Sequence, residues 1–243
     1  MSDGIYTALS GAIAQQYALD VAANNAANVN TTGYRGDRPV FEEVLAKAGA
    51  GRAPDVLRWV QASDTATTRS EGISRATGNP LDIALHGDGF LVVQTANGER
   101  YTRAGSFFAG PGGELVTQDG DAVLGDSGPI VLPSRHATVS FGTDGSIKAD
   151  GASAGKLKIV KIDADVPLRK EGGALLRLDA DGFVPQQDDS TEVMQGYLEG
   201  SNVHAIGSVT EMVTVSRSFD AFQKIIQTYR QLDDRAARDI AGR

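Results

Sequence analysis

The histidines and the acidic turns are the residues of this sequence best suited to metal or acid–base chemistry. The three histidines stand alone, without the partner three or four positions away that a histidine metal site on a helix uses. They are His86, His136 and His204. Two acidic turns, Asp119–Asp121 and Asp179–Asp181, offer the oxygen ligands that calcium prefers. Neither turn extends into a twelve-residue loop that ends in glutamate, and Asp-Gly is itself a hairpin-turn sequence, so we expect turns here and no metal.

The glycine-rich segments give no sign of a nucleotide site. Gly87–Gly89 and Gly110–Gly113 each precede an expected strand, whereas a phosphate cradle needs a helix N-terminus behind the glycines. The sequence contains no Gly-x-Ser-x-Gly elbow and no cysteine nucleophile. Catalysis is therefore not the expected role, and we expect neither an enzyme nor a bound cofactor.

Charge and hydropathy narrow the classes of partner. The net charge of −8 over 243 residues argues against broad binding to nucleic acid, which needs a concentration of lysine and arginine. No apolar run reaches the roughly 18 residues of a membrane span, and the first residues lack the basic, then apolar pattern of a cleaved signal. The simplest interpretation is a cytoplasmic protein, unless export uses a pathway without a cleaved signal.

Both ends of the sequence carry apolar residues at alternating steps of three and four, which place them on one stripe of a helix. The N-terminal row, interrupted at Gln16, contains Ile5, Leu9, Ala12, Leu19, Ala23 and Ala26. The C-terminal row contains Met212, Val215, Phe219, Phe222, Ile226 and Tyr229. This is the pattern of a coiled-coil seam, so we expect two terminal helices that pack as a pair and form an assembly surface.

The other faces of these two helices differ in polarity. The N-terminal helix, expected over residues 4–28, contains one charged residue, Asp20, which fits a helix packed on several sides, in an assembly or in an ordinary core. For the start of the C-terminal helix, Asn202 and Ser208 both qualify as N-caps, and Ser208 with Glu211 matches a capping box. The C-terminal helix has a charged face made of Arg217, Asp220, Lys224, Arg230, Asp234 and Arg238.

Between the helices, short apolar runs flank pairs of residues that favour hairpin turns. The pairs are Asn97-Gly98, Asp119-Gly120, Asp144-Gly145 and Asp181-Gly182. We expect strands at 90–95 and 99–103, 114–117 and 121–124, 139–141 and 146–149, and 175–178 and 183–184. Four such hairpins predict an antiparallel β domain.

The expected fold class is therefore α+β, with N- and C-terminal α-helices packing as a coiled-coil-like pair and a central antiparallel all-β domain. Residues 1–45 and 201–243 would form a discontinuous helical assembly domain. Residues 46–72, rich in alanine, glycine and threonine, would form a linker with a short strand at 56–61, and residues 73–200 the β domain.

Three segments, in order along the chain, resemble the flagellar basal-body rod and hook protein family. Residues 22–34 are similar to its N-terminal signature, an Ala-Asn-Asn-x-Ala-Asn core followed by Thr-x-Gly-aromatic. The signature residues are Asn24, Asn25, Asn28, Thr32, Gly33 and Tyr34. Residues 77–90 with 101–107 resemble the opening of the middle domain, and residues 198–203 with 211–213 resemble the entry to the C-terminal helix.

Within this family the chain is most similar to proximal-rod members, through its length and residues 123–133. Distal-rod members carry a Tyr-Gln-rich stretch with Arg-Gln-Pro-Gly after the first helix, which residues 46–58 lack, and hook proteins are usually longer. The resemblance implies a structural subunit that the flagellar type III apparatus exports unfolded. It would assemble in the periplasm into a helical tube that transmits torque.

The implied partners are other copies of the chain, other rod proteins and, transiently, the flagellar export gate, with no nucleic acid and no membrane insertion. Phe41 and Leu45 resemble the short signal by which rod and hook subunits dock on that gate, and on a helical turn they would share one face. Alternatively, they pack the chain onto the β domain.

Three other functions stay open at this point. A distal-rod or hook-type protein of the same family fits most of the same residues. A membrane-surface module would use the C-terminal helix, although its polar face mixes aspartate with arginine instead of concentrating lysine. An enzyme with an unrecognised site is the third.

Overall fold

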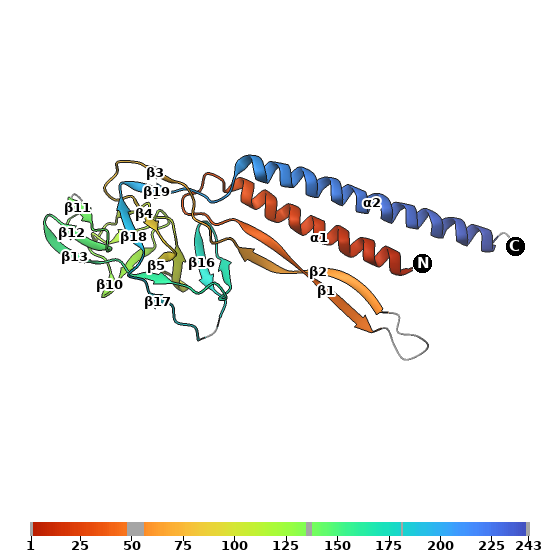
Figure 1. Cartoon of the computed structure of the whole chain (residues 1–243), viewed down its shortest axis with the longest axis horizontal. Coiled ribbons are helices and arrows are strands. Elements are labelled where there is room, and N and C mark those ends of the chain that lie inside the picture. The colour runs from red at the N-terminus through yellow and green to blue at the C-terminus, as the bar shows by residue number, and fades with distance from the viewer. Residues whose placement is uncertain (1, 48–55, 135–137, 181, 242–243) are drawn as a thin grey trace. The chain divides into compact units, whose positions relative to one another are not determined.

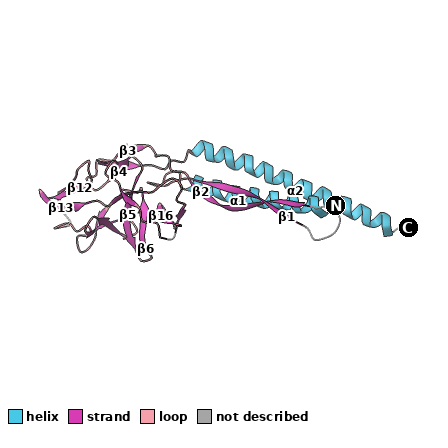
Figure 2. Cartoon of the chain, turned by 60° about the horizontal axis from the view of Figure 1, so that its bottom comes forward, coloured by secondary structure: helices cyan, strands magenta, loops and turns pink. Residues whose placement is uncertain are grey.

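The computed structural model of this protein describes residues 2–47, 56–134, 138–180 and 182–241. Along the chain one long helix precedes the strands and another follows them, so the α+β fold class is confirmed (Figure 2). Helix α1 spans Ser2–Ala27 and helix α2 spans Ala205–Ala241. The chain divides into two compact units, one made of residues 1–27, 37–66 and 205–243 and the other of residues 28–36 and 67–204.

In the first unit, α1 lies between α2 and a two-stranded sheet (Figure 1). Strand β1 covers Asp37–Lys47 and strand β2 covers Val56–Thr67. Strand β2 extends over residues where we expected mainly a linker. Its mixed side chains do not predict a long strand, but pairing with β1 satisfies the hydrogen bonds of its backbone. The sparsely charged sequence of α1, whose charged residues are Asp3 and Asp20, agrees with packing on two sides.

The start of α2 differs from the expected capping box. The helix begins at Ala205, so Ser208 lies inside it, buried, and does not cap it. Asn202, the other candidate, uses its side chain to bind Gly36, Thr68 and Ser70. The expected charged face is confirmed, because its six residues are all exposed.

The second unit, which we call the β body, contains short strands. They are β3 (Ser74–Ala76), β4 (Ile83–His86), β5 (Gly89–Thr95), β6 (Gly98–Thr102), β7 (Phe108–Ala109), β8 (Leu115–Val116), β9 (Ala122–Gly125), β10 (Gly128–Pro129), β11 (Val139–Phe141), β12 (Ser146–Ala149), β13 (Ala152–Lys156), β14 (Ile159–Lys161), β15 (Leu168–Lys170), β16 (Leu175–Leu178), β17 (Gln186–Gln187), β18 (Glu192–Gln195) and β19 (Tyr197–Glu199).

Most of these strands belong to one sheet. Its main path runs β15-β16-β6-β5-β9-β8-β7, with β10 beside β9 and β14 beside β5 and β17. Smaller sheets pair β11-β12-β13, β18 with β4, and β19 with β3. The pairings of the β body are antiparallel wherever the structure describes their register, as expected.

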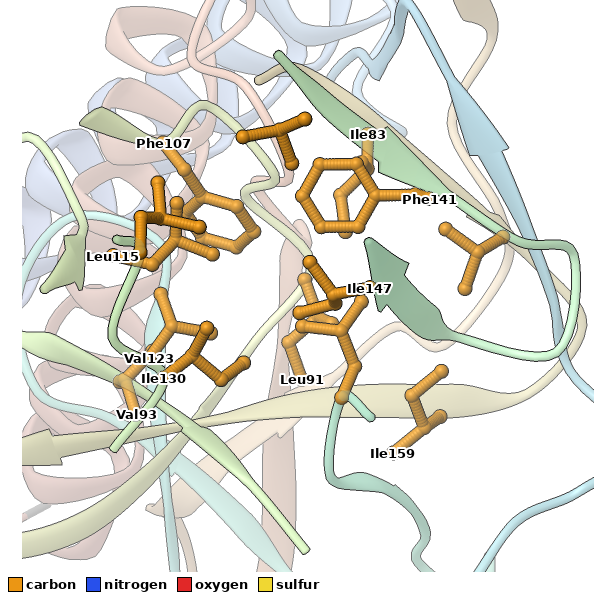
Figure 3. Packing of buried hydrophobic residues seen from close by; sticks show 14 of the residues in the cluster. Ile83, Leu91, Val93, Phe107, Leu115, Val123, Ile130, Phe141, Ile147 and Ile159 are labelled. Carbon is orange, nitrogen blue, oxygen red and sulfur yellow. The ribbon is translucent and has the colours of Figure 1, made fainter. Parts of the chain in front are cut away.

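Strand β5 separates two hydrophobic clusters. Leu91 and Val93 point into the larger one, whose members Phe107, Leu115 and Ile147 are fully buried (Figure 3). The alternate residues Phe90 and Val92 belong to the second cluster, with Tyr101, Val160 and Leu176. Because successive side chains of a strand point to opposite faces, an unbroken apolar run at 90–93 serves both cores.

Three of the four expected hairpins are confirmed and one is wrong. The pairs β5-β6, β8-β9 and β11-β12 form around the three turns expected at Asn97, Asp119 and Asp144. Strand β16 instead pairs with β15 and β6, and residues 183–184 form no strand. Gly172 and Gly173 both have positive φ and supply the turn that joins β15 to β16. Asp181 lies outside the described residues.

Candidate functional site

The family-like signature falls on two sides of a boundary between the units. Its first part, Asn24 and Asn25, belongs to the last turn of α1. Its second part, from Asn28 onward, is a turn in the β body, where the hydroxyl of Thr31 donates to the side-chain oxygen of Asn28 over 3.1 Å. Thr32 lines a groove of about 500 Å³ together with Ile73 and Leu198.

Gly33 occupies a position that no other residue can take. Its φ of 68° lies in the left-handed region, and a Cβ atom would stand 2.2 Å from the backbone nitrogen of Ala104. Its own N–H donates to the carbonyl of Glu199 over 2.8 Å. The missing side chain of Gly33 therefore lets its backbone lie directly against the backbone at Ala104.

Tyr34, the aromatic residue of the signature, is fully buried. The Lys170 ammonium lies 3.7 Å from its ring centroid, a cation–π arrangement. The carbonyl of Tyr34 accepts the backbone N–H of Asn202 over 3.2 Å. The Lys170 charge thus contacts the ring of Tyr34, and the hydrogen bond from Asn202 holds its backbone.

A buried group of three charges lies next to Tyr34. One oxygen of the Glu199 carboxylate is 2.6 Å from Nη1 of Arg35 and accepts the N–H of Gly72 over 2.8 Å. The other oxygen accepts Nη1–H of Arg103 over 3.2 Å. All three side chains are about 1% exposed. The single Glu199 carboxylate lies between two guanidinium groups and lowers the cost of burying them, because isolated charges are costly to bury.

Arg103 has further partners inside the β body. Its Nη2 donates to the carbonyl of Gly87, and its guanidinium carbon lies 5.1 Å from the ring centroid of Phe90. Burial lowers the pKa of the Arg103 guanidinium, and the neighbouring Glu199 carboxylate opposes that shift. Even so, an arginine stays protonated. The Glu199 carboxylate therefore offsets the repulsion between the guanidinium groups of Arg35 and Arg103.

Asn202 holds the same region from the other side. Its side-chain oxygen accepts the N–H of Gly36 over 2.7 Å, and its amide donates to the carbonyls of Thr68 and Ser70 over 3.1 and 3.0 Å. We call Gly33, Tyr34, Arg35, Glu199 and Asn202 the signature clasp. It ties three segments far apart in sequence, around residues 33–36, 68–72 and 199–202, and it contains no free nucleophile or base.

Asn25 has a comparable role within the helical unit. Its side-chain amide donates to the carbonyl of Asp37 over 2.7 Å, and its side-chain oxygen accepts the N–H of Asp37 over 2.9 Å. One buried side chain thus satisfies both backbone groups at the first residue of β1. Asn24 lies on the exposed side of α1.

The C-terminal row lies on the less exposed side of α2. Ile226 is buried with Ala8 and Ala12 of α1, and Phe219 and Phe222 pack against these three. Met212, Val215 and Tyr229 are half-buried. An assembly role for this row stays a prediction.

The N-terminal row is split by the structure. Ala12 is buried, whereas Leu9 is 44% exposed. Ile5, Leu19, Ala23 and Ala26 are intermediate. The sequence reasoning missed the small residues Gly4, Ala8 and Gly11, which lie under the large side chains of α2. Gly4 and Gly11 stand seven positions apart, a spacing that could have revealed them.

Phe41 and Leu45 both lie in strand β1, so the folded chain does not present them on a helical turn. Phe41 is 40% exposed. The side chain of Leu45 lies outside the described part. A role in export would belong to the chain before it folds.

The residues suited to metal chemistry lie apart from one another in the described part of the chain. No group of three or more metal-ligating side chains occurs there. His86 is exposed and lies 3.5 Å from Glu71, His204 is exposed, and His136 falls outside the described residues. The helices described include none long and apolar enough to cross a membrane.

The terminal helices pair and leave apolar side chains exposed, and the signature residues of the β body bind its own backbone, a combination typical of a subunit that packs against neighbours. Family models match the chain in three places. They are the flagella basal body rod protein model at residues 5–35, the flagellar hook protein FlgE/F/G D1 domain model at 84–149, and the flagellar basal body rod FlgEFG protein C-terminal model at 194–239.

Curated relatives match over almost the whole length. The chain is 32% identical to the flagellar basal-body rod protein FlgF of Caulobacter vibrioides, over 99% of this chain and 98% of the relative. It is 36% identical to FlgF of Escherichia coli, over 98% and 97%. It is 32% identical to the flagellar basal-body rod protein FlgG of Bacillus subtilis, over 94% and 95%. The chain belongs to the flagellar basal-body rod protein family, whose members are structural proteins and not enzymes.

Proposed function

We propose that this chain is an axial structural subunit of the flagellar rod, in its proximal part. It is exported unfolded by the flagellar type III apparatus and assembles in the periplasm, with copies of itself and other rod proteins, into a helical tube that transmits torque. The observation that carries this proposal is the alignment of nearly the whole chain with two FlgF proteins at 32% and 36% identity. The exposed apolar side chains of the helices, such as Tyr6, Ile13 and Ile206, support it by offering surface for neighbours.

Deletion and recovery of the chain in purified basal bodies test the role. A strain without the chain should not swim, and a tagged copy should restore swimming and co-purify with basal bodies. A deletion strain that swims and assembles normal basal bodies would contradict the proposal.

A distal-rod position is the second candidate, because FlgG of Bacillus subtilis also aligns over most of the chain. Gold labelling of the tagged chain in isolated basal bodies separates the two. Label at the cell-proximal end of the rod supports the proximal position. Label next to the hook supports the distal one.

The export step has its own test. A Phe41→Ala, Leu45→Ala double variant should remain in the cytoplasm as folded protein and be missing from the periplasm. Phe108→Ala is a matched control, because Phe108 is a similarly exposed phenylalanine, 49% against 40% for Phe41, in a strand of the β body. Normal secretion of the double variant would leave Phe41 with only a packing role.

A further inference from the structure

Two glycines of α1 lie directly under two aromatic rings of α2. A Cβ atom at Gly11 would stand 2.5 Å from Cε1 of Phe222, and one at Gly4 would stand 2.7 Å from Cζ of Tyr229. Atoms do not pack this closely, so a side chain at either glycine would have to displace a ring. The rings therefore fill sockets that exist only because the side chain is missing.

The two contacts also define the register of the pair. Positions rise by seven from Gly4 to Gly11 and fall by seven from Tyr229 to Phe222, so the helices run antiparallel with a heptad step. Continuing the step places Ala18 opposite Val215. Ala18 is buried and Val215 is half-buried, which agrees with this extension.

Side-chain size is graded in opposite directions along this row. From one end to the other, α1 presents Gly4, Gly11 and Ala18, while α2 presents Tyr229, Phe222 and Val215. The largest side chains thus face the smallest ones. Such pairing keeps the distance between two helices even, because each layer is filled to a similar volume.

A slip of one heptad in either direction spoils this match. In one direction Tyr229 passes the start of α1, and Gly11 meets Val215 in place of a ring, which leaves a void. In the other direction Phe222 meets Ala18, where a methyl group occupies the socket. Both voids and overpacking destabilise a packed interface, so only one register satisfies all three layers.

We propose that this size ladder, made of Gly4, Gly11 and Ala18 against Tyr229, Phe222 and Val215, determines the register in which α1 packs on α2, and that the assembled rod requires this register. A helix without glycines at these two layers cannot accept the rings. Gly4 and Gly11 are then specificity-determining residues for assembly, an inference that rests on the proposed rod function.

The first test asks whether a glycine-to-alanine change raises or lowers the incorporation of the chain into basal bodies. In an open helix this change favours the helix, because alanine has the higher helix propensity. In a socket it should displace a ring, so Gly11→Ala should lower incorporation into basal bodies about five- to thirtyfold, normalised to exported protein. Gly207→Ala is the matched control, since Gly207 is exposed in the first turn of α2, and it should leave incorporation unchanged.

The second test asks whether a smaller ring partner corrects the defect, and in which chain. Phe222→Leu on the same chain as Gly11→Ala should restore most of the incorporation, because it makes room for the new methyl group. Co-expression of a Gly11→Ala chain with a separate Phe222→Leu chain should not restore the Gly11→Ala chain.

Each remaining outcome contradicts a stated part of the proposal. Full incorporation of Gly11→Ala would show that assembly does not need a glycine at this position. If Phe222→Leu on the same chain does not restore incorporation, the Phe222 ring is not the cause of the Gly11→Ala defect. Recovery in the mixed strain would mean that the helices pair between chains. A deletion strain that swims normally would contradict the rod function instead, and the ladder would then be judged by whether Phe222→Leu restores helical circular dichroism lost in Gly11→Ala.

Discussion

The helix pair and the β body bury different kinds of side chain. The buried apolar contact between α1 and α2 consists of Ala8, Ala12 and Ile226, with two phenylalanines at its edge. The β body buries two clusters of leucine, isoleucine, valine and phenylalanine, many of them completely. Meanwhile the helices expose large apolar side chains, with Tyr6 63% and Ile13 60% accessible.

This difference indicates where each region obtains its stability. Each buried methylene contributes about 0.8 kcal/mol, so an alanine-lined contact gains little compared with a leucine and isoleucine core. Isolated helices are marginal in water and depend on packing of an apolar face. The β body therefore contains its own stabilising core, and we expect the helix pair to need contacts from neighbouring subunits.

Hydrogen exchange of the isolated subunit should show the largest difference. We expect backbone amides of β5 and β6 to exchange at least about a thousandfold more slowly than those of residues 5–28 and 212–240, because opening free energies range from near zero to the global value. Exchange should be measured on a verified monomer by mass spectrometry. Equal protection in both regions would show that the helix pair is stable without neighbours.

Removal of the Glu199 carboxylate should have the largest effect of a single substitution. Glu199→Ala leaves Arg35 and Arg103 buried without their shared counter-charge, and breaking a buried ion pair costs about 3–5 kcal/mol. Urea unfolding of the β body measures this loss. Asp189→Ala, which removes an exposed partner of Lys156, is the control and should unfold like the wild type. Equal midpoints for both variants would remove the clasp as a stabilising element.

Truncation of Phe222 should separate the two regions. Phe222→Ala should weaken the helix pair by about 2–3 kcal/mol, below the usual cost for a phenylalanine because this ring is only partly buried. Incorporation into rods should fall while the β body keeps its urea midpoint. The neighbouring exposed Gln223→Ala serves as the control. Normal motility of Phe222→Ala would show that the ring is no anchor.

Asn25 should give the smallest of these effects. Asn25→Leu removes both hydrogen bonds to Asp37 and should destabilise the helical unit by about 1–3 kcal/mol, with Asn25→Asp in between because it keeps the acceptor. Hydrogen exchange of the Asp37 backbone amide measures the loss of its bond to Asn25 directly. Unchanged exchange together with weakened assembly would instead indicate pairing between subunits.

Local patterns were sufficient where local chemistry decides the structure. Asn-Gly and Asp-Gly between apolar runs predicted three hairpins, because the turn and the alternation both act over a few residues. The row and the charged face of α2 followed from helical periodicity. The fourth hairpin failed because another glycine pair, Gly172-Gly173, made the turn.

Long-range pairing was beyond the reach of those patterns. Nothing local to Arg35 indicates that it meets Glu199, more than 160 positions away. The position of Asn202 predicts a helix cap, whereas its side-chain amide binds segments around residues 36 and 70. The sockets at Gly4 and Gly11 escaped notice because a glycine adds nothing to a hydrophobic pattern. Their role depends on what the partner helix places above them.

The backbone crossings at Gly33 and Gly72 restrict how this sequence can diverge during evolution. A Cβ atom at Gly72 would stand 2.0 Å from the carbonyl oxygen of Gly200, and one at Gly33 would meet the backbone at Ala104. Backbone atoms cannot move aside as a side chain can, so selection should keep both glycines. Gly120 has a positive φ but nothing within 4 Å of its Cβ position, so lineages are free to replace it with asparagine or aspartate. Related chains should therefore lose turn glycines while these two persist.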